Sequence, residues 1–161
     1  MNREKAGIIL NSPDTLQCLF TDPQLTGFSG RKIIALLQNL ATCLDVQNES
    51  YLEIGVYRGM SLVSVSKVFE GTVYGIDNFS QFDREKRNYN LIRDHCERLD
   101  LRNLNLINDD FEAALRNLRD HVGNRKIGLL FIDGPHDYRS QLMCLLLSEA
   151  YLSDSAVIVV D

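Results

Sequence analysis

The stretch Tyr51–Ser61, which reads YLEIGVYRGMS, constrains the fold of this chain more than any other. It combines a short apolar run with one acid, Glu53, and two glycines, Gly55 and Gly59, ahead of a helix-like pattern. Such a pattern predicts a buried strand that turns sharply into a helix whose first amide groups face a ligand. Gly55 permits the tight turn without a Cβ clash, and Gly59 lets the helix and the ligand approach closely.

The carboxylate of Glu53 indicates which kind of ligand the turn accepts. In dinucleotide-binding proteins the glycines run G-x-G-x-x-G and a pyrophosphate lies over the helix start, whereas the spacing here is E-x-G-x-x-x-G. A carboxylate about 4 Å from a pyrophosphate charge would repel it by roughly 1 kcal/mol in water and by about 4 kcal/mol at an effective dielectric constant of about 20. That repulsion lowers affinity by up to roughly a thousandfold. The motif therefore favours a cationic nucleoside, whose amine or sulfonium would be attracted.

The rest of the chain after Ser50 alternates strictly between strand and helix patterns. Runs such as LLFI at 129–132 and VIVV at 157–160 are continuously apolar, as expected when helices cover both faces of a parallel sheet. Right-handed crossovers between such strands produce a doubly wound α/β sheet. Strands are predicted at 50–55, 72–77, 103–108, 127–133 and 155–161, and helices at 59–69, 82–100, 110–121 and 138–151.

The N-terminal part of the chain, residues 1–49, is predicted to be a helical segment that packs on or lids the domain formed by residues 50–161. Ser12 and Pro13 suit the N-cap and first position of a short helix. A longer helix is predicted from Ser29 to about Asp45, because apolar residues recur there on one helical face.

Four later segments follow the glycine motif in a fixed order, and they are Val73–Asp77, Asn105–Phe111, Ile127–Asp133 and Ala156–Asp161. With Tyr51–Ser61 they resemble the ordered motifs of class I S-adenosylmethionine-dependent methyltransferases, over the chain from Ser50 to its end. The resemblance implies a Rossmann-like sheet with strand order 3-2-1-4-5 and S-adenosyl-L-methionine as the cofactor.

The family's sheet normally continues with another helix and two strands, so we expect these C-terminal strands to be absent from this chain. Residues 156–160 would then form an open apolar edge, which is an aggregation hazard. We therefore expect a fragment, or a partner or missing segment that covers this edge.

Ligands in open α/β sheets bind beyond the carboxyl ends of the strands, near the switch in strand order. The resemblance assigns Glu53 to the methionine amine, Asp77 to both ribose hydroxyls and Asp109 to the adenine amino group. Each acid also has a purely structural alternative, because acids are favoured at helix starts and cap helices. For Asp110 capping is the main expectation, and Phe79 could lie against the adenine or act as a hydrophobic staple. The complete predicted cofactor-binding set is Glu53, Gly55, Gly59, Asp77, Asn78 and Asp109.

The segment FIDGPHDY at 131–138 is the best candidate for chemistry. Asp133 closes a strand and would face the transferred methyl, while His136 follows three residues later. A carboxylate can hold a divalent cation, and a neutral imidazole can take a proton from a hydroxyl near pH 7. The alternative for both residues is a hydrogen-bonded turn without a catalytic role.

This D-x-x-H arrangement is similar to that of metal-dependent O-methyltransferases that act on sugars and other hydroxylated small molecules. The resemblance implies Asp133 and Asp161 as ligands of Mg²⁺ or another divalent cation, with a further acid after Asp161. Two departures weaken the match, since Pro135 stands where an acid is frequent and Asp137-Tyr138 replaces a Ser-Tyr pair.

Composition limits the remaining possibilities. A net charge of −5 with scattered Lys and Arg argues against a nucleic-acid partner. No apolar run has membrane-spanning length and the N-terminus lacks a secretion signal, so we expect no membrane partner and a cytoplasmic protein. The four separated cysteines indicate reduced thiols. His95 is expected to face solvent and His121 to lie at a helix C-terminus, so neither is a catalytic candidate.

The sequence therefore predicts an S-adenosylmethionine-dependent methyltransferase that methylates an oxygen of a small hydroxylated molecule, with or without metal assistance. One alternative is a catalytically silent domain that binds the cofactor or scaffolds a partner. The other is a nicotinamide-nucleotide oxidoreductase or a nucleotide-sugar enzyme on a similar fold, which would need a third glycine where Tyr57 stands. The identity of the methyl acceptor and the formation of a homo-oligomer are left open.

Overall fold

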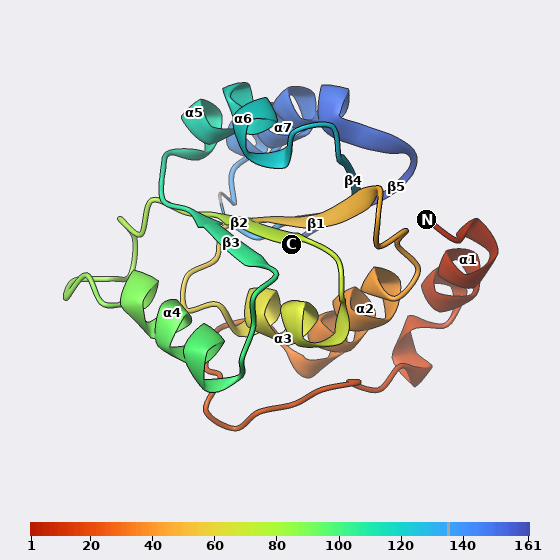
Figure 1. The fold of residues 1–161 in the computed structure, drawn as a ribbon, viewed down its shortest axis with the longest axis horizontal. Coiled ribbons are helices and arrows are strands. Elements are labelled where there is room, and N and C mark those ends of the chain that lie inside the picture. The colour runs from red at the N-terminus through yellow and green to blue at the C-terminus, as the bar shows by residue number, and fades with distance from the viewer. Residues whose placement is uncertain (135) are drawn as a thin grey trace.

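The computed structural model describes residues 1–134 and 136–161, and its centre is one five-stranded sheet (Figure 1). The strand order is β3-β2-β1-β4-β5, and every neighbouring pair is parallel, which confirms the predicted order 3-2-1-4-5. The strands are β1 (Glu49–Ile54), β2 (Val73–Ile76), β3 (Leu104–Ile107), β4 (Lys126–Ile132) and β5 (Leu152–Val160).

Helices cover both faces of this sheet, as the continuously apolar strands predict (Figure 1). One layer holds α2 (Arg31–Ala41), α3 (Met60–Val68) and α4 (Asn88–Arg98), with α1 (Arg3–Asn11) beside α2. The other layer holds α5 (Phe111–Arg116), α6 (Leu118–Val122) and α7 (Tyr138–Ser148), and α7 continues into the 3-10 turn η2 (Glu149–Tyr151).

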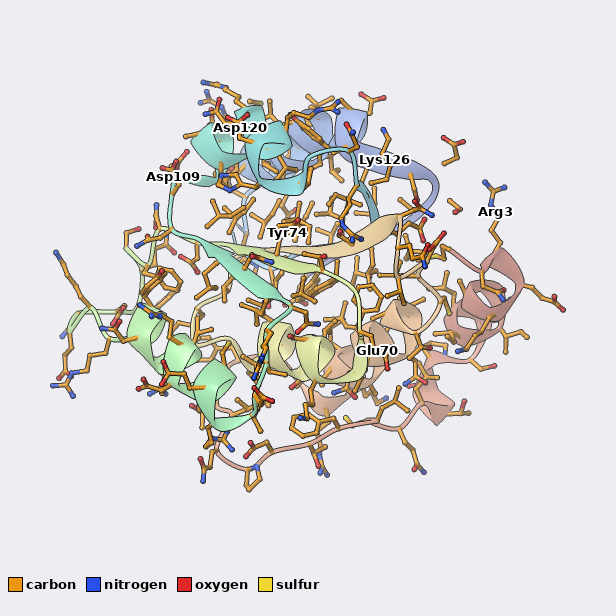
Figure 2. All side chains as sticks on the ribbon, viewed as in Figure 1. Arg3, Glu70, Tyr74, Asp109, Asp120 and Lys126 are labelled. Carbon is orange, nitrogen blue, oxygen red and sulfur yellow. The ribbon has the colours of Figure 1, made fainter. Side chains whose placement is uncertain are left out.

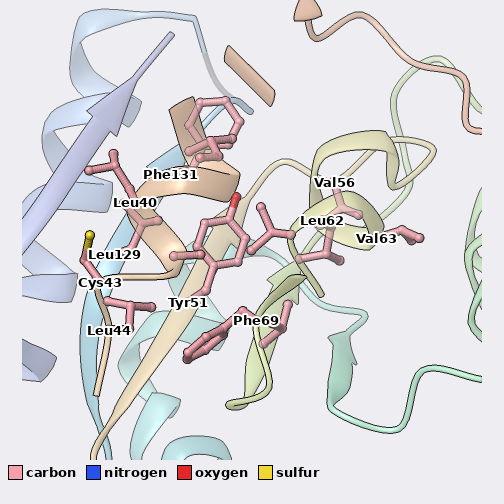
Figure 3. Packing of buried hydrophobic residues seen from close by; sticks show 14 of the residues in the cluster. Leu40, Cys43, Leu44, Tyr51, Val56, Leu62, Val63, Phe69, Leu129 and Phe131 are labelled. Carbon is pink, nitrogen blue, oxygen red and sulfur yellow. The ribbon is translucent and has the colours of Figure 1, made fainter. Parts of the chain in front are cut away.

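Alternation along β1 divides the core between the two layers. Tyr51 belongs to the buried cluster on the α2–α3 side, while Leu52 and Ile54 belong to the cluster on the other side. Figure 3 shows the Tyr51 ring in the middle of the first cluster, between Leu40 and Leu62. Residues 1–49 contribute to this cluster through α1 and α2, and the boundary between the two predicted parts stays a prediction.

The register of the ladders brings the carboxyl ends of the strands level. Ile54 pairs with Ile76 on one side and with Ile132 on the other, and these pair in turn with Ile107 and Val160. The residue after each of these therefore lies in one row along the edge of the sheet. That row is Gly55, Asp77, Asn108, Asp133 and Asp161.

The helix predicted over 82–100 begins later, at Asn88, and the prediction for residues 82–87 is wrong. The carboxylate of Asp83 accepts the backbone N–H groups of Arg87 and Asn88. Asp83 therefore caps the N-terminus of α4 although it lies in the loop before the helix. The helix predicted over 110–121 is divided at Asn117 into α5 and α6. The Asn117 side chain donates to the carbonyl of Ala113 at 3.1 Å, which competes with regular helical geometry.

Ser12 is the N-cap and Pro13 the first residue of η1 (Pro13–Thr15), so the predicted short helix is present as a 3-10 turn. The helix α1, which precedes it, was not predicted. The residue that caps the start of α1 is Asn2, whose side chain accepts the backbone N–H of Lys5.

His95 is buried, with 6% of its surface exposed, and the prediction that it faces solvent is wrong. It lies beside the ion pair between Arg98 and Asp22, and its Nδ1 is 3.3 Å from a guanidinium nitrogen of Arg98. Burial lowers the pKa of His95. His121 is in the last turn of α6, as expected.

Among the helices that the structure describes, none is long and apolar enough to cross a membrane. The cellular location stays a prediction.

Candidate active site

A cavity of about 620 Å³ opens at the level row of strand ends, and we call it the strand-end cavity. The register explains why residues from β1, β2, β4 and β5 meet there, since ligands of open α/β sheets bind at this edge. It is lined by Gly55, Asp77, Asn78, Asp109, Asp133, His136 and Asp161, together with residues of the adjoining loops. Of the predicted site residues, Glu53 and Gly59 lie outside the lining.

Both glycines of the motif have positive φ and close neighbours. Gly55 has φ +90°, and a Cβ there would come within 2.3 Å of the Cα of Gly134. Gly59 has φ +79°, and a Cβ would meet the side chain of Ile92 at 2.8 Å. The predicted tight turn is therefore present, and its glycines are required by backbone conformation and packing. Their contact with a cofactor stays a prediction.

Asp77 organises the loop that follows β1. One carboxylate oxygen accepts the backbone N–H groups of Val56 and Tyr57, both at 2.8 Å, and the other accepts that of Phe79 at 2.7 Å. Bonds of this kind to a charged group are among the stronger hydrogen bonds in proteins. Asp77 thus shapes the turn and also lines the cavity, where the role toward the ribose stays a prediction.

Glu53 is fully buried, and two hydroxyl groups contact its carboxyl group. The Tyr51 hydroxyl lies 2.6 Å from one oxygen, and the Ser61 hydroxyl lies 2.7 Å from the other. Burial raises the pKa of Glu53 to about 8; the two hydroxyls oppose this shift, whereas the charges of Asp133 and Asp77 add to it. Ser61 lines the strand-end cavity, so its hydroxyl connects the buried Glu53 to the cavity by a hydrogen bond.

Neither Tyr51 nor Ser61 was predicted to belong to this group. A signal existed for Tyr51, because residues two apart on a strand point to the same face. Figure 3 shows apolar side chains around the Tyr51 ring. A buried tyrosine hydroxyl needs a hydrogen-bond partner, and here that partner is Glu53, two residues along the same strand. Ser61 lies in the first turn of α3.

Glu53→Gln is expected to change how stability depends on pH. Between about pH 4.5 and 8 the folded protein keeps a proton on Glu53 that the unfolded chain releases, so the stability of the wild type falls as pH rises through this window. The glutamine variant lacks this dependence, so its free energy of unfolding relative to the wild type should rise by up to about 4 kcal/mol from pH 4.5 to 8. Urea denaturation at several pH values measures it. The exposed Glu70→Gln serves as the control, and a constant difference between the Glu53 variant and the wild type would contradict a protonated Glu53.

The segment after β3 has two acids with different positions. Asp110 caps α5 by accepting the N–H groups of Glu112 and Ala113, as predicted. Asp109 lies where the chain turns from β3 into α5 (Figure 2), is exposed and lines the cavity. Its role toward adenine stays a prediction, as does the cofactor contact of Asn78, whose side chain accepts the N–H of Ser80.

Of the two roles predicted for Phe79, contact with the adenine or hydrophobic packing, the structure shows packing. It is buried and meets the ring of Tyr89 from α4 edge to face, with centroids 5.6 Å apart. It is absent from the cavity lining.

Asp133 and Asp161 follow paired positions on β4 and β5 and face one another at the end of the sheet. Burial, and then the neighbouring carboxylate of Asp161, raises the pKa of Asp133 to about 6. The Ser29 hydroxyl lies 3.4 Å from Asp133, and the exposed His136 lines the same part of the cavity. Pro135, the predicted departure from the family pattern, lies outside the described residues. Asp137 caps α7 through the N–H of Ser140.

No group of three His, Cys, Asp or Glu side chains suited to a metal ion occurs in residues 1–134 and 136–161. Asp133 and Asp161 supply two facing carboxylates, which are the ligand type that Mg²⁺ prefers.

Three aromatic rings from separate loops meet at the cavity, and we call Phe28, Tyr57 and Phe82 the aromatic cluster. Phe28 stacks on Tyr57 with centroids 4.8 Å apart, and Phe82 meets both rings edge on at 6.0 and 6.3 Å. Phe28 and Phe82 are 78% and 76% exposed. Tyr57 and Phe82 have φ near +50°, a left-handed conformation that costs a bulky residue about 1–3 kcal/mol. No motif in the sequence predicts this cluster.

A second cavity of about 600 Å³ is lined by α4 and the edge strand β3. Its lining includes Arg93, Glu97, Arg102 and His121, and it contains none of the predicted site residues. The strand-end cavity is therefore the candidate active site.

Comparison with known proteins agrees with this geometry. Residues 52–161 match the protein family described as "Methyltransferase domain". No curated protein matches the chain.

Several solved structures share the fold. An O-methyltransferase from Bacillus cereus, in complex with S-adenosylhomocysteine, superposes with a TM-score of 0.68 at 16% identity, over 100% of this chain and 74% of that one. The O-methyltransferase TomG from Streptomyces achromogenes, which is involved in tomaymycin synthesis and holds S-adenosylmethionine, has the same TM-score, identity and coverage. An rRNA methylase from Streptococcus thermophilus superposes with a TM-score of 0.61 at 16% identity, over 83% of this chain and 72% of that one. The chain spans between 65% and 74% of the length of the first such structures.

Proposed function

This chain belongs to the methyltransferase domain family, and from that premise we propose that it binds S-adenosyl-L-methionine and transfers the methyl group to a hydroxyl oxygen of a small molecule. The observation that carries the proposal is the row of acids at the level strand ends around one cavity. Asp77, Asp109, Asp133 and Asp161 line that cavity, and the protonated Glu53 lies behind it. The lining carboxylates attract a sulfonium and an ammonium group, and they repel a pyrophosphate.

The lining suggests how the cofactor would lie in the strand-end cavity. Asp77 would accept the ribose hydroxyls, Asp109 would lie at the adenine, and the oxygen of Ser61, whose hydroxyl contacts Glu53, would accept a hydrogen bond from the methionine amine. This order follows the strands from β2 and β3 toward β4, so the sulfonium would lie near Asp133. The O-methyltransferases from B. cereus and S. achromogenes, crystallised with the cofactor product or the cofactor, support the same ligand class.

Methyl transfer then requires an acceptor held in line with the sulfur and relieved of its proton. The bond from sulfur to the methyl carbon breaks as the bond from the acceptor oxygen forms, and neutral S-adenosylhomocysteine leaves. The hydroxyl proton passes to Asp133 or to His136, both of which line this end of the cavity. The protein contributes mainly the positioning of the two reactants.

A divalent cation such as Mg²⁺ would be held by Asp133 and Asp161. When bound, such an ion lowers the pKa of an acceptor hydroxyl and orients it. The facing carboxylates fit two of its ligand positions, and the described residues supply no third.

The proposal predicts a selective response to nucleoside ligands. S-adenosylmethionine and S-adenosylhomocysteine should raise the melting temperature, while NAD should leave it unchanged because the acids repel its pyrophosphate. An equal shift with NAD would reject the proposal in favour of a nicotinamide enzyme.

The same preparation separates binding from chemistry through His136→Ala. The variant should keep the affinity for S-adenosylmethionine and lower turnover by about 100-fold or more, since a positioned base contributes about that much. Cofactor binding without transfer to any hydroxylated acceptor in the wild type would instead identify a silent cofactor-binding domain.

A further inference from the structure

Building on the proposed function, we propose that the aromatic cluster of Phe28, Tyr57 and Phe82 is the acceptor subsite, and that it takes the flat ring of an aryl hydroxyl compound. The three rings come from the loop before α2, the loop after β1 and the loop after β2, and all three line the strand-end cavity. They are brought together by the fold and by nothing in the local sequence.

The exposure of the cluster shows that the protein core does not need it. Phe28 and Phe82 expose more than three quarters of their surface, and neither belongs to a buried cluster of the core. Tyr57 and Phe82 also keep the left-handed backbone that disfavours bulky side chains. Strained, exposed aromatic residues that converge on a cavity are explained by a ligand that covers them.

The cluster also lies next to the residues that would act on the acceptor hydroxyl. Phe28 immediately precedes Ser29, whose hydroxyl lies 3.4 Å from the Asp133 carboxylate. A ring that packs against Phe28 can therefore direct a substituent toward Asp133. The cluster also borders the acid assigned to the ribose, because the backbone N–H of Tyr57 donates to Asp77 at 2.8 Å.

The geometry of the rings indicates the chemical class of the ligand. Aromatic rings prefer partners at 4.5–7 Å in stacked or edge-to-face arrangements. The three rings already pack on one another in this way, with centroids 4.8, 6.0 and 6.3 Å apart, and the exposed surfaces of Phe28 and Phe82 are left for a ligand ring. Arg58 lies with its guanidinium carbon 6.0 Å from the Tyr57 ring centre and lines the same cavity, which suits an acceptor with an anionic substituent. A phenol also loses its proton at about pH 10, whereas water does so only near a pKa of about 15.7, so an aryl hydroxyl is the easier nucleophile.

Calorimetry on the full chain saturated with S-adenosylhomocysteine tests the subsite, with catechol and methyl α-glucoside as probes. Catechol should bind at least about tenfold tighter than the glucoside. Phe28→Leu and Phe82→Leu should each weaken catechol by about 2- to 10-fold, the range that one aromatic contact contributes. Both variants should leave the affinity for S-adenosylhomocysteine within twofold.

Tyr138→Leu is the matched control, because Tyr138 is 82% exposed and is not part of the cavity lining. It should change neither affinity. Equal binding of the glucoside, absence of catechol binding, or leucine variants that weaken S-adenosylhomocysteine and not catechol would each overturn the acceptor subsite. Absence of S-adenosylhomocysteine binding to the wild type would reject the proposed function itself, so the two failures are distinguishable.

Discussion

Gly55→Ala should destabilise the protein by about 3–5 kcal/mol, which is a large part of the stability of a typical domain. Two causes act together at this position. The backbone has φ +90°, which alanine adopts only with strain, and the added Cβ would come within 2.3 Å of the Gly134 backbone. Backbone atoms cannot move aside as the end of a side chain can. The turn between β1 and α3 would therefore open, and cofactor binding would be lost with it.

Chemical denaturation measures this effect, and Gly7→Ala provides the control. A Cβ at Gly7 meets no atom within 4 Å, and the residue lies inside α1. Alanine there should raise stability by about 0.5–1 kcal/mol, because glycine is a poor helix former. If Gly55→Ala kept the stability of the wild type, the close approach of the two strand-end loops would be wrong.

Asp77→Ala should lower both stability and cofactor affinity. Removal of the carboxylate leaves the N–H groups of Val56, Tyr57 and Phe79 without the acceptor that holds the loop. We expect a loss of about 2–3 kcal/mol in stability, since hydrogen bonds to charged groups contribute about 1.5–3 kcal/mol each and this site is partly exposed. The affinity for S-adenosylmethionine should fall by about 100-fold or more, because the ribose loses its acceptor and the loop its shape.

Asp83→Ala separates these two effects. Asp83 also accepts two backbone N–H groups, those of Arg87 and Asn88, but it does not line the strand-end cavity. Its removal should cost about 1 kcal/mol in stability, as for a lost helix cap, and should leave cofactor affinity unchanged. Calorimetric titration of both variants tests the assignment, and an unchanged affinity in Asp77→Ala would remove Asp77 from the cofactor site.

The parts of the fold that follow from local patterns were predictable from the sequence. The strands were recognisable because each contains a short stretch of mainly apolar residues, and their order followed from the resemblance. The acids of the site were recognisable because they come immediately after those runs. Asp77, Asp133 and Asp161 accordingly lie in the predicted row at the edge of the sheet.

What depends on contacts between distant segments was not predictable. His95 has charged sequence neighbours, yet it is buried beside the ion pair of Asp22 and Arg98, which joins segments distant in sequence. The start of α4 was misplaced because Asp83 caps it from several residues upstream. The aromatic cluster depends on three loops whose spacing in sequence contains no periodic signal.

Because the cofactor residues follow the strands and the aromatic cluster lies on loops, substitutions in these two regions have different consequences. Residues that would hold the cofactor follow directly from strands, where a shift of one position turns every side chain to the opposite face. Phe28, Tyr57 and Phe82 lie instead on loops, whose lengths and side chains can vary while the sheet is kept. Substrate preference can therefore diverge among descendants of this chain through loop substitutions alone, with the methyl donor retained.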